Sequence, residues 1–379
     1  MGSAVPDVRP SASATPAGQV VTADLDYMCE ALRDELPRLA GRHLLVTGGA
    51  GFLGHYLVGL LLHWNQRSGT RPIGVTVYDN LVRGVPPWLE QWSGDPALTL
   101  VRHDVTAPLP EGMRDFDYII HAASIASPTY YRKYPIETMD ANVNGLRALL
   151  EYARRRRESV GGFLFFSSSE IYGDPTPEHI PTPETYRGNV SCTGPRACYD
   201  EAKRYGETLC VNFANHADIP VTVARPFNNY GPGLKITDRR VLPDFARDVL
   251  AGRDIVMYSD GSPKRTFCYV ADAVIGYYKI LLRGRPGEAY NIGFEEPEIS
   301  ILELAELVVA VARDLFGYRG RVVRQSPADQ SYLLDNPSRR RPVIAKARDE
   351  LGYRPMVSLR EGLWRSLVWY AEHRQAEEA

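Results

Sequence analysis

Short apolar runs rich in Val, Ile, Leu and Phe recur from residue 43 to residue 228, and amphipathic stretches separate them. Runs of this length and composition predict strands that are buried on both faces. They lie at residues 43–49, 73–80, 98–105, 116–123, 162–169 and 220–228. Apolar residues at helical spacing follow the first run and appear again at 136–156 and 199–216. This alternation predicts an α/β fold with a doubly wound parallel sheet of the Rossmann type.

The pattern changes after residue 226, where Gly- and Pro-containing loops alternate with helical spacing at 239–251, 270–282 and 300–315. We therefore predict a Rossmann domain over residues 42–225, to which residues 267–290 return. A smaller C-terminal α/β substrate-binding domain is expected over residues 226–266 and 291–379. Upstream, residues 1–20 are rich in Ala, Ser and Pro and are predicted to be disordered. Residues 21–41 are predicted to hold an amphipathic helix with Thr22 as its N-cap.

Composition and charge exclude several classes of function. The formal net charge is −2, so no global field favours nucleic acid or an anionic membrane as partner. No apolar run approaches the ~18 residues of a membrane span, and the N-terminus lacks the pattern of a signal peptide. The five cysteines are odd in number and form no Cys-x-x-Cys, which argues against disulfide frameworks and metal sites. We expect a cytoplasmic protein with free thiols and no bound metal.

A glycine pattern between the first predicted strand and its helix indicates a dinucleotide site. "GGAGFLG" places Gly48, Gly51 and Gly54 where the backbone must turn sharply and approach a pyrophosphate. Asp79 ends the second strand, where a carboxylate accepts from the ribose hydroxyl and repels a 2′-phosphate, so NAD is favoured over NADP. Arg83 lies close enough to offset that repulsion, but we expect it to be solvated. The predicted cofactor contacts are Gly48, Gly51, Phe52, Leu53, Gly54, Asp79, Asn80, Asp104, Val105, Ala122, Tyr199 and Lys203.

The stretch "GPRACYDEAKRYGE" provides a candidate catalytic pair. Tyr199 and Lys203 are four residues apart, so on a helix they share a face and the ammonium favours the ionised phenol. Ser168, Ser169 and Glu170 follow the end of the fifth strand, which places them over the reactive end of the cofactor. A free tyrosine has a pKa of about 10, so it needs nearby positive charge to act as a base near neutrality.

Four features occur along the chain in the order that characterises the extended short-chain dehydrogenase/reductase family. They are the glycine turn, the acid after the second strand, the serines at the end of the fifth strand and the Tyr-x-x-x-Lys pattern. The chain resembles that family over about residues 42–372. The resemblance implies that Tyr199 is the general base, that Lys203 lowers the pKa of Tyr199 and binds the nicotinamide ribose, and that Ser168 hydrogen-bonds the reacting oxygen. It also implies a homodimer that forms through a four-helix contact.

Four segments resemble the UDP-glucuronate decarboxylase group within that family. They are "ASPTYYRKYPIET" (126–138), "SSSEIYGDP" (167–175), "GNVSCTGPRACYDEAKRYGET" (188–208) and "DGSPKRTFCYV" (260–270). The resemblance implies functional roles for Glu170 and Arg265. Related 4,6-dehydratases carry an Asp-Glu pair whose Asp expels the C6 hydroxyl. This chain has Ser169 at the Asp position, which argues against dehydration.

The resemblance implies a UDP-sugar substrate whose glucuronate carboxylate is oriented by Arg265 and Tyr131. The guanidinium of Arg240 can donate two hydrogen bonds to a phosphate, and the ring of Tyr258 can stack on uracil. Asn228 follows a strand and is expected to contact the diphosphate. One arginine of the run 339–341, Arg340, is expected near the nucleotide. The expected substrate contacts are Tyr131, Ser168, Glu170, Asn228, Arg240, Tyr258, Arg265 and Arg340. Gly233 departs from the pattern, because many relatives carry arginine there.

The leading hypothesis is NAD-dependent decarboxylation of UDP-glucuronate to UDP-xylose, to the UDP-4-keto-pentose, or to both. Oxidation at C4 places the C6 carboxylate β to a ketone, so CO2 can leave and the charge that remains rests on the C4 oxygen. Two alternatives remain open. One is an NAD-dependent sugar-nucleotide 4-epimerase or 4,6-dehydratase, and the other is a non-catalytic NAD-binding protein.

Overall fold

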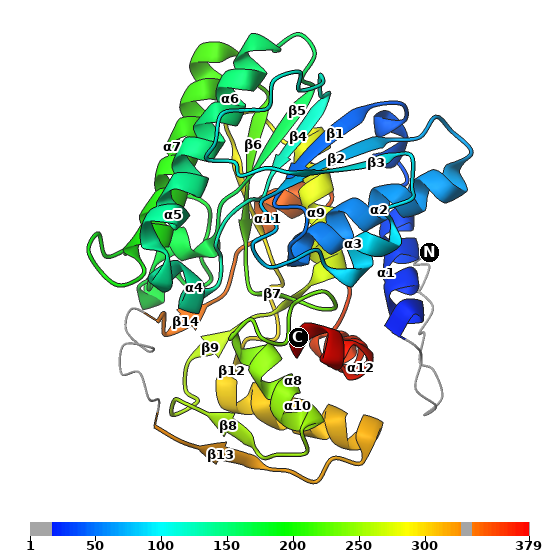
Figure 1. Ribbon diagram of the computed structural model, residues 1–379. Helices are drawn as coiled ribbons and strands as arrows, with labels where there is room; N and C mark the ends of the chain where they lie inside the picture. The colour runs from blue at the N-terminus through cyan, green and yellow to red at the C-terminus, as the bar shows by residue number, and fades with distance from the viewer. Residues whose placement is uncertain (1–16, 327–335, 379) are drawn as a thin grey trace.

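The computed structural model describes residues 17–326 and 336–378 (Figure 1). Its main sheet has seven strands in the order β11-β6-β5-β4-β1-β2-β3, and all neighbouring strands are parallel. The order reverses between β1 and β4, which is where open α/β sheets bind their ligands. The strands are β1 (His43–Thr47), β2 (Gly74–Asp79), β3 (Leu98–Arg102), β4 (Tyr118–His121), β5 (Gly162–Phe166), β6 (Val221–Pro226) and β11 (Ala289–Ile292). The predicted Rossmann-type doubly wound sheet is confirmed.

Helices cover both faces of the sheet, because successive strand residues point to opposite sides. In β5, Leu164 and Phe166 join the core beneath α2 (Phe52–Ser68) and α9 (Val270–Arg283). Phe163 and Phe165 join the separate core beneath α6 (Leu146–Arg155) and α7 (Ala197–Ala217). A π-helical turn, Ala141–Gly145, joins α5 (Pro135–Asp140) to α6. Because α9 packs on β5 and β6, the chain returns to the sheet after it enters the second module.

The smaller module lies below the carboxyl edge of the sheet (Figure 1). Its short strands pair as β12-β9-β14 and β13-β8, and α8 and α10 pack together over them. Its elements are α8 (Val241–Leu250), β8 (Ile255–Met257), β9 (Lys264–Arg265), β12 (Ile299–Ser300), α10 (Ile301–Phe316), β13 (Val322–Arg324), β14 (Arg339–Arg340) and α12 (Leu359–Glu378). The pair β7 (Asn229–Tyr230) and β10 (Cys268–Tyr269) connects it to the Rossmann domain. The remaining helices are α3 (Pro87–Gln91), α4 (Pro128–Lys133) and α11 (Ala345–Leu351), with 3-10 turns at Leu36–Leu39, Ser169–Tyr172 and Pro177–His179.

The N-terminal helix begins earlier than the sequence predicts. Helix α1 spans Ala17–Ala31, so Thr22 lies inside it and its hydroxyl donates to the Gly18 carbonyl at 2.8 Å rather than capping the helix. Residues 17–20 are therefore helical, and the rest of the predicted disordered tail, residues 1–16, lies outside the described residues. The N-cap prediction was wrong because a threonine hydroxyl can also bond a carbonyl one turn back within a helix.

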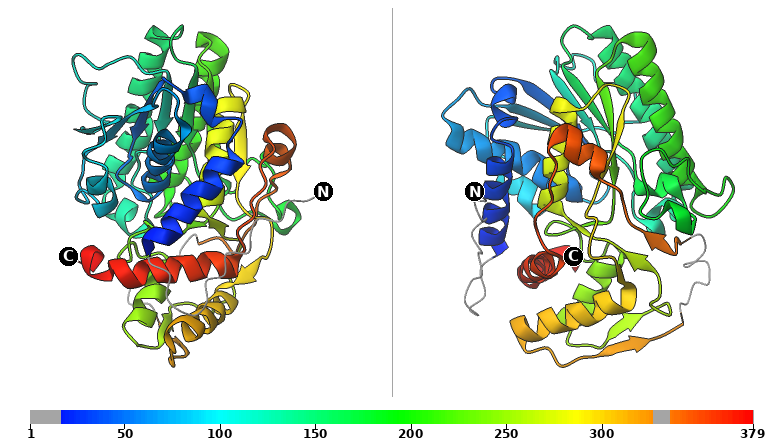
Figure 2. Two further views of the ribbon diagram at one scale, coloured as in Figure 1. Left: turned by 90° about the vertical axis from the view of Figure 1, so that its right-hand side faces the viewer. Right: turned by 180° about the vertical axis from the view of Figure 1, so that it is seen from behind.

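A buried carboxylate fastens α1 to the rest of the molecule. Asp24 accepts hydrogen bonds from the hydroxyls of Tyr56 and Tyr269, each at 2.6 Å, and pairs with Arg365 of α12. Helix α1 packs against α2 and against the C-terminal half of α12, as the left view of Figure 2 shows. Helix α12 contacts α8 and α10 of the smaller module, so this network joins both parts of the fold.

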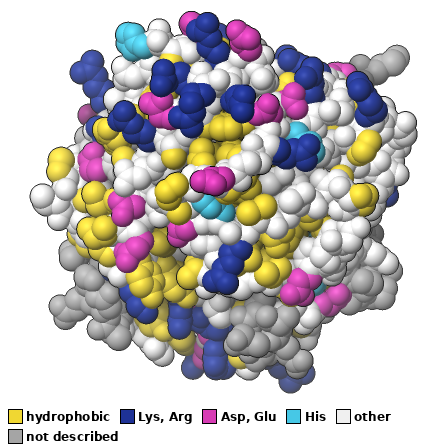
Figure 3. Space-filling model, turned by 45° about the horizontal axis from the view of Figure 1, so that its top comes forward, with side chains coloured by type: hydrophobic (Ala, Val, Ile, Leu, Met, Phe, Trp, Pro, Cys, Tyr) yellow, Lys and Arg dark blue, Asp and Glu magenta, His cyan; other side chains and the backbone are white. Residues whose placement is uncertain are grey.

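Surface charges of both signs are interspersed on the face shown in Figure 3, as the near-zero net charge suggests. Among the helices of the described residues, none has both the length and the apolar character that crossing a membrane requires.

Candidate active site

One cavity of about 1960 Å³ follows the carboxyl ends of strands β1 to β6 and extends to the smaller module. A single small-molecule pocket usually has a volume of ~300–1000 Å³, so this cavity has room for a dinucleotide and a second ligand together. Residues from both parts of the chain line it. Asp79 and Ser168 come from the Rossmann domain, and Arg240, Tyr258 and Arg265 come from the second module.

The glycine loop has the shape that a pyrophosphate requires. Gly48 has φ +71°, and a Cβ there would lie 2.6 Å from the Ala123 Cα, so no other residue fits without moving the β4 loop. Helix α2 begins just after Gly51 without a side-chain cap, which leaves its first N–H groups to face a phosphate. Gly48, Gly51, Phe52 and Leu53 line the cavity, whereas Gly54 does not. These residues fit the diphosphate of NAD.

The acidic positions of the predicted cofactor site also line the cavity. The two carboxylate oxygens of Asp79 each accept one backbone N–H, from Leu81 at 2.9 Å and from Ala50 at 3.1 Å. Each oxygen keeps capacity for a ribose hydroxyl, because a carboxylate accepts about four hydrogen bonds. Burial raises the pKa of Asp79. The Asp104 carboxylate accepts hydrogen bonds from the backbone N–H and the hydroxyl of Thr106, and the bond from the backbone N–H lowers the pKa of Asp104. Asn80, Val105 and Ala122 line the same wall.

The candidate catalytic groups lie together at the nicotinamide end. Tyr199 and Lys203 are buried on the same face of α7, with the Lys203 Nζ 5.5 Å from the Tyr199 ring centroid. Lys203 donates to the Phe166 carbonyl at 2.6 Å, which anchors it to the end of β5. Burial raises the pKa of Tyr199 to about 12, although its hydrogen bond with Ser168 opposes that rise. Burial lowers the pKa of Lys203 to about 7. Tyr199 therefore needs further positive charge, which the oxidised nicotinamide supplies when bound.

Glu170 is held between two arginines at the sugar end of the cavity. One carboxylate oxygen pairs with Arg196 and the other with Arg340. Burial favours the neutral acid, but Arg196, Arg340 and Arg265 outweigh it and lower the pKa of Glu170 to about 2. Arg340 also donates to the Ser169 hydroxyl at 3.3 Å. Glu170 is thus ionised at neutral pH, whereas burial raises the pKa of its neighbour Asp200 to about 8, so three guanidinium groups lie near one ionised carboxylate.

Arg265 and Tyr131, the residues expected to orient the sugar carboxylate, border the same cluster. The guanidinium of Arg265 donates to the Asn336 side chain at 3.1 Å and to the Pro337 carbonyl at 2.5 Å rather than to Glu170. Arg340, which we expected near the nucleotide, is instead the arginine of the second module that pairs with Glu170. The Tyr131 ring stacks on Tyr199 at 5.1 Å, and its buried hydroxyl has no hydrogen-bond partner among the described residues. That unpaired hydroxyl faces a region where a ligand is expected.

The residues expected at the nucleotide end are more widely spread. Asn228 has φ +42° and donates to the Thr266 carbonyl at 2.8 Å. Arg240 uses its Nε to bond Asp238 at 2.5 Å, and its terminal nitrogens can still take a phosphate. Tyr258 is 39% exposed at the rim of the cavity, a suitable position for a stacking surface. All three line the cavity.

The departure at Gly233 has a steric cause. Gly233 has φ +88°, and a Cβ there would lie 2.7 Å from Nδ1 of His55, in the first turns of α2. His55 stacks on Trp88 with ring centroids 4.8 Å apart, so it has little room to move. An arginine at position 233 would therefore be strained in this chain.

Sequence reasoning missed two functional neighbours. Arg196 precedes Tyr199 by three residues and contacts Glu170, which only the turn from loop into α7 makes possible. Asp238 binds Arg83 and Arg240 from two different loops. Arg83 is therefore paired with Asp238, while its side chain stays 43% exposed to solvent. The presence of Arg196 in the quoted motif was a usable signal, but nothing local pointed to Asp238.

Among the described residues, no cluster of three or more His, Cys, Asp or Glu side chains is arranged to hold a metal ion.

Comparison with curated proteins connects this geometry with a known group. The chain is 39% identical to UDP-glucuronic acid decarboxylase 3 of Arabidopsis thaliana over 321 residues, which cover 84% of this chain and 86% of that protein. It is 37% identical to UDP-glucuronic acid decarboxylase 1 of Xenopus tropicalis over 87% of this chain and 72% of the relative. The resemblance to the decarboxylase group is confirmed.

Solved structures share the fold. A dTDP-glucose 4,6-dehydratase from Streptomyces venezuelae with NAD bound is 28% identical, with a TM-score of 0.76 over 89% of this chain and 99% of that one. A UDP-glucose 4-epimerase from Thermotoga maritima with UDP-glucose is 26% identical, with a TM-score of 0.74 over 88% and 99% of the two chains. The model of the NAD dependent epimerase/dehydratase family matches residues 44–293. On these grounds, and in agreement with its glycine loop and its Ser168, Tyr199 and Lys203, the chain belongs to the NAD dependent epimerase/dehydratase family.

Proposed function

We propose that the chain is a UDP-glucuronate decarboxylase that works through a 4-keto intermediate. The observation that carries this proposal is the excess of positive charge at the sugar end of the cavity. Arg196, Arg265 and Arg340 lie around Glu170, and the second carboxyl group of the cluster, Asp200, has its pKa raised to about 8 by burial, so it is mostly neutral at pH 7. A substrate with a second carboxylate at C6 compensates that charge, whereas a neutral hexose does not. The similarity to relatives named UDP-glucuronic acid decarboxylases supports the same substrate.

The first chemical step belongs to Tyr199. Its phenolate takes the proton of the C4 hydroxyl, while Ser168 hydrogen-bonds the same oxygen. The protonated form of Lys203, whose pKa burial lowers to about 7, places positive charge beside the Tyr199 ring. Bound NAD supplies the hydride acceptor at C4 and later the hydride donor. The result is a ketone at C4, which places the C6 carboxylate β to a carbonyl.

Loss of CO2 then requires the carboxylate to be oriented but not overstabilised. The carbon–carbon bond breaks, and its electron pair moves onto the C4 oxygen, where Ser168 and Tyr199 can donate hydrogen bonds. Strong binding of the departing carboxylate would stabilise the substrate more than the transition state, because negative charge leaves the carboxylate as CO2 forms. Arg196 and Arg340 already share the charge of Glu170, so they orient the substrate with reduced net attraction. Because Glu170 is ionised, it serves to direct a water that protonates C5.

The two catalytic alternatives fit the site less well. A 4,6-dehydratase needs an acid to expel the C6 hydroxyl, and the matching position is Ser169, whose hydroxyl accepts from Arg340. A 4-epimerase that acts on a neutral hexose has no negative charge at C6 for the three guanidinium groups to bind. A non-catalytic NAD-binding protein would not need to keep Ser168, Tyr199 and Lys203 together.

We further propose that the protein is a cytoplasmic homodimer. Ile136 and Met139 of α5 are 63% and 44% exposed, and Tyr205 and Val211 of α7 are 47% and 38% exposed. These helices pack together on one outer face of the sheet (Figure 1). Such apolar exposure favours a partner surface, and a second copy forms a closed four-helix contact. The five cysteines are unpaired, which supports a reducing compartment.

Incubation of the purified chain with NAD and UDP-glucuronate tests the function. We expect CO2 release with UDP-glucuronate and no reaction with UDP-glucose, which has the same nucleotide and no C6 carboxylate. Epimerised or dehydrated UDP-glucose would support an alternative instead.

A further inference from the structure

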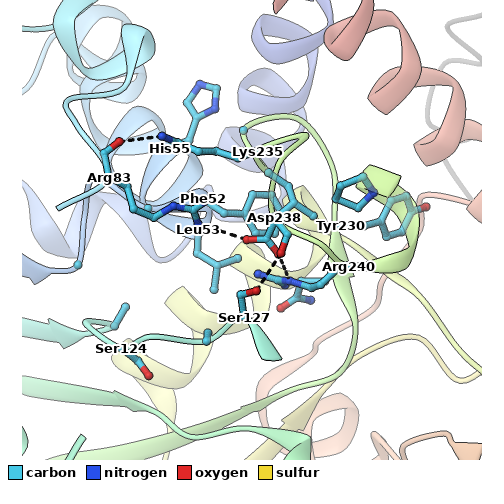
Figure 4. A pocket seen from close by; sticks show the side chains of 18 of the residues that line it. Phe52, Leu53, His55, Arg83, Ser124, Ser127, Tyr230, Lys235, Asp238 and Arg240 are labelled. Carbon is cyan, nitrogen blue, oxygen red and sulfur yellow. Dashed lines mark hydrogen bonds and ion pairs between the residues drawn. The ribbon is translucent and has the colours of Figure 1, made fainter. Parts of the chain in front are cut away.

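The loop at residues 231–240, between β7 and α8, carries a buried carboxylate that binds two arginines. Asp238 is 2% exposed, and its two oxygens have different partners. Arg83, in the loop after β2, donates to Oδ2 at 3.3 Å, and Arg240 donates to Oδ1 through Nε at 2.5 Å. Figure 4 shows Asp238 between these two side chains. One carboxylate therefore connects the cofactor loop after β2 with the start of α8 in the substrate-binding module.

Further contacts fasten the same loop to the Rossmann domain. Lys235 donates to the Arg83 carbonyl at 2.8 Å, and the Ser127 hydroxyl, in the loop after β4, donates to the Asp238 carbonyl at 2.8 Å. The Arg83 guanidinium lies 5.3 Å from the ring centroid of Tyr130, which limits its movement. Arg83 belongs to the loop after β2, Ser127 to the loop after β4, and Tyr130 to α4, which follows that loop. The two loops also border the predicted cofactor contacts Asp79 and Ala122.

The loop also crosses the start of α2, where the cofactor diphosphate is expected. Gly233 lies against His55, and Phe52, Leu53, Arg83, Lys235 and Asp238 line the same cavity. Arg239, beside Asp238, has φ +68°, a conformation that residues other than glycine adopt at a cost. The contacts of Asp238 hold the loop in this strained conformation.

We propose that Asp238 is a positioning residue that clamps the 231–240 loop over bound NAD and retains the cofactor throughout turnover. The reaction proposed above has no net oxidation, because the hydride taken from C4 returns to C4. A cofactor that left in its reduced form would strand the keto sugar and leave the protein without a hydride. Retention follows if cofactor release requires the loop to open, because opening breaks the guanidinium–carboxylate bond between Arg83 and Asp238 and the hydrogen bonds that Lys235 and Ser127 form across the gap. The bond between Arg240 and Asp238 lies within the loop and keeps Asp238 oriented.

Cofactor release from the full chain, measured without any sugar nucleotide, tests the clamp. The protein is loaded with NADH and diluted into excess NAD+, and the decay of protein-bound NADH fluorescence gives the dissociation rate. We expect Asp238→Asn to raise that rate by about tenfold or more, because the amide can accept from only one of the two arginines. Asp254→Asn is the matched control, since it removes an exposed ion pair with Arg321 at the edge of the second module.

Arg83→Met provides a second variant if Asp238→Asn fails to fold, because Arg83 is partly exposed at the surface. It removes the bond to Asp238 and should also raise the dissociation rate severalfold. Folded variants at positions 238 and 83 that both release NADH at the wild-type rate would overturn the clamp. Because no sugar nucleotide is present, this result is independent of the decarboxylase assay. A chain that retains NAD but leaves UDP-glucuronate intact would contradict only the proposed function.

Discussion

At the residue scale, catalysis depends on charges that lie in a buried site. Tyr199 has its pKa raised to about 12 by burial, so the phenol is a poor base until positive charge surrounds it. Lys203 is one source of that charge and the oxidised nicotinamide is the other. The ammonium is itself destabilised by burial, which lowers the pKa of Lys203 to about 7.

Lys203→Met should therefore change the pH dependence as well as the rate. Removing the cation raises the pKa of Tyr199, so the phenolate becomes rarer near neutrality and the acid limb of the kcat profile moves to higher pH. We expect kcat at pH 7 to fall by roughly 10²–10⁴-fold, with partial recovery at alkaline pH. Tyr199→Phe should be inactive at every pH. An acid limb that stays in place in Lys203→Met would show that the ammonium does not act on Tyr199.

Glu170→Gln tests the carboxylate held by Arg196 and Arg340. The amide cannot neutralise both guanidinium groups, so they grip the substrate carboxylate more tightly, and the water at C5 loses its orientation. We expect CO2 release to slow by about 100-fold or more, while the dissociation constant for NAD, measured by fluorescence, stays within about twofold. Glu178→Gln, at an exposed carboxylate, is the control. Equal losses in NAD binding and CO2 release would contradict this role.

Local sequence patterns were enough only for the residues whose roles are local, whereas Arg265 and Arg340 were expected near the substrate from the family resemblance alone. The glycine loop, Tyr199 with Lys203, and the Ser168–Glu170 segment each act within one turn or one helix, so their order along the chain was enough to place them near one another. Arg340 and Arg265 meet the Glu170 cluster only because β14 pairs with β9. That pairing joins segments 75 residues apart, and no local pattern reveals it.

At the scale of elements, the start of α2 and the 231–240 loop restrict each other. Gly233 has a positive φ, and the space that a side chain would occupy is filled by His55. The sequence showed only that an expected arginine was missing. The arginine is excluded by His55 in α2, which stacks on Trp88 and lies about 180 residues away in the chain. Only the structure shows that the two positions are in contact.

Gly233→Ala should be destabilising for two separable reasons. The positive φ costs about 1 kcal/mol for any residue with a Cβ, and the contact with His55 adds a steric cost. His55→Ala should relieve only the second part. In a double-mutant cycle followed by thermal unfolding, we therefore expect Gly233→Ala to cost less in the His55→Ala background than in wild type. Equal costs in both backgrounds would show that His55 does not restrict position 233.

At the scale of the whole molecule, the alternation of strands and helices predicted the parallel sheet because most of its strands are buried on both faces. The edge strand β3 is an exception to that prediction, since Thr99 and Leu100 are exposed. The start of α1 was not predictable in the same way, since helix α1 is stabilised by distant partners. Asp24 binds Tyr56, Tyr269 and Arg365, which lie on three other parts of the chain.

The proposed dimer makes a prediction at the same scale. Replacing both Ile136 and Met139 with Glu places charge on the exposed apolar surface of α5, which should split a dimer into folded monomers. Light scattering after gel filtration measures the mass. Val82→Glu, at another strongly exposed apolar residue in the loop after β2, should leave the mass unchanged. A wild-type chain that is monomeric at micromolar concentration would contradict the dimer.

The most direct test of the account follows the C6 carbon of the substrate. UDP-glucuronate carrying an isotopic label at C6 is incubated with the NAD-loaded chain, and the gas and the remaining sugar nucleotide are analysed by mass spectrometry. The account predicts labelled CO2 in proportion to the substrate consumed, with a UDP-pentose or UDP-4-keto-pentose that carries no label. A sugar nucleotide that keeps its labelled carbon, whether unchanged, epimerised or dehydrated, would contradict the claim that a ketone at C4 releases the neighbouring carboxylate.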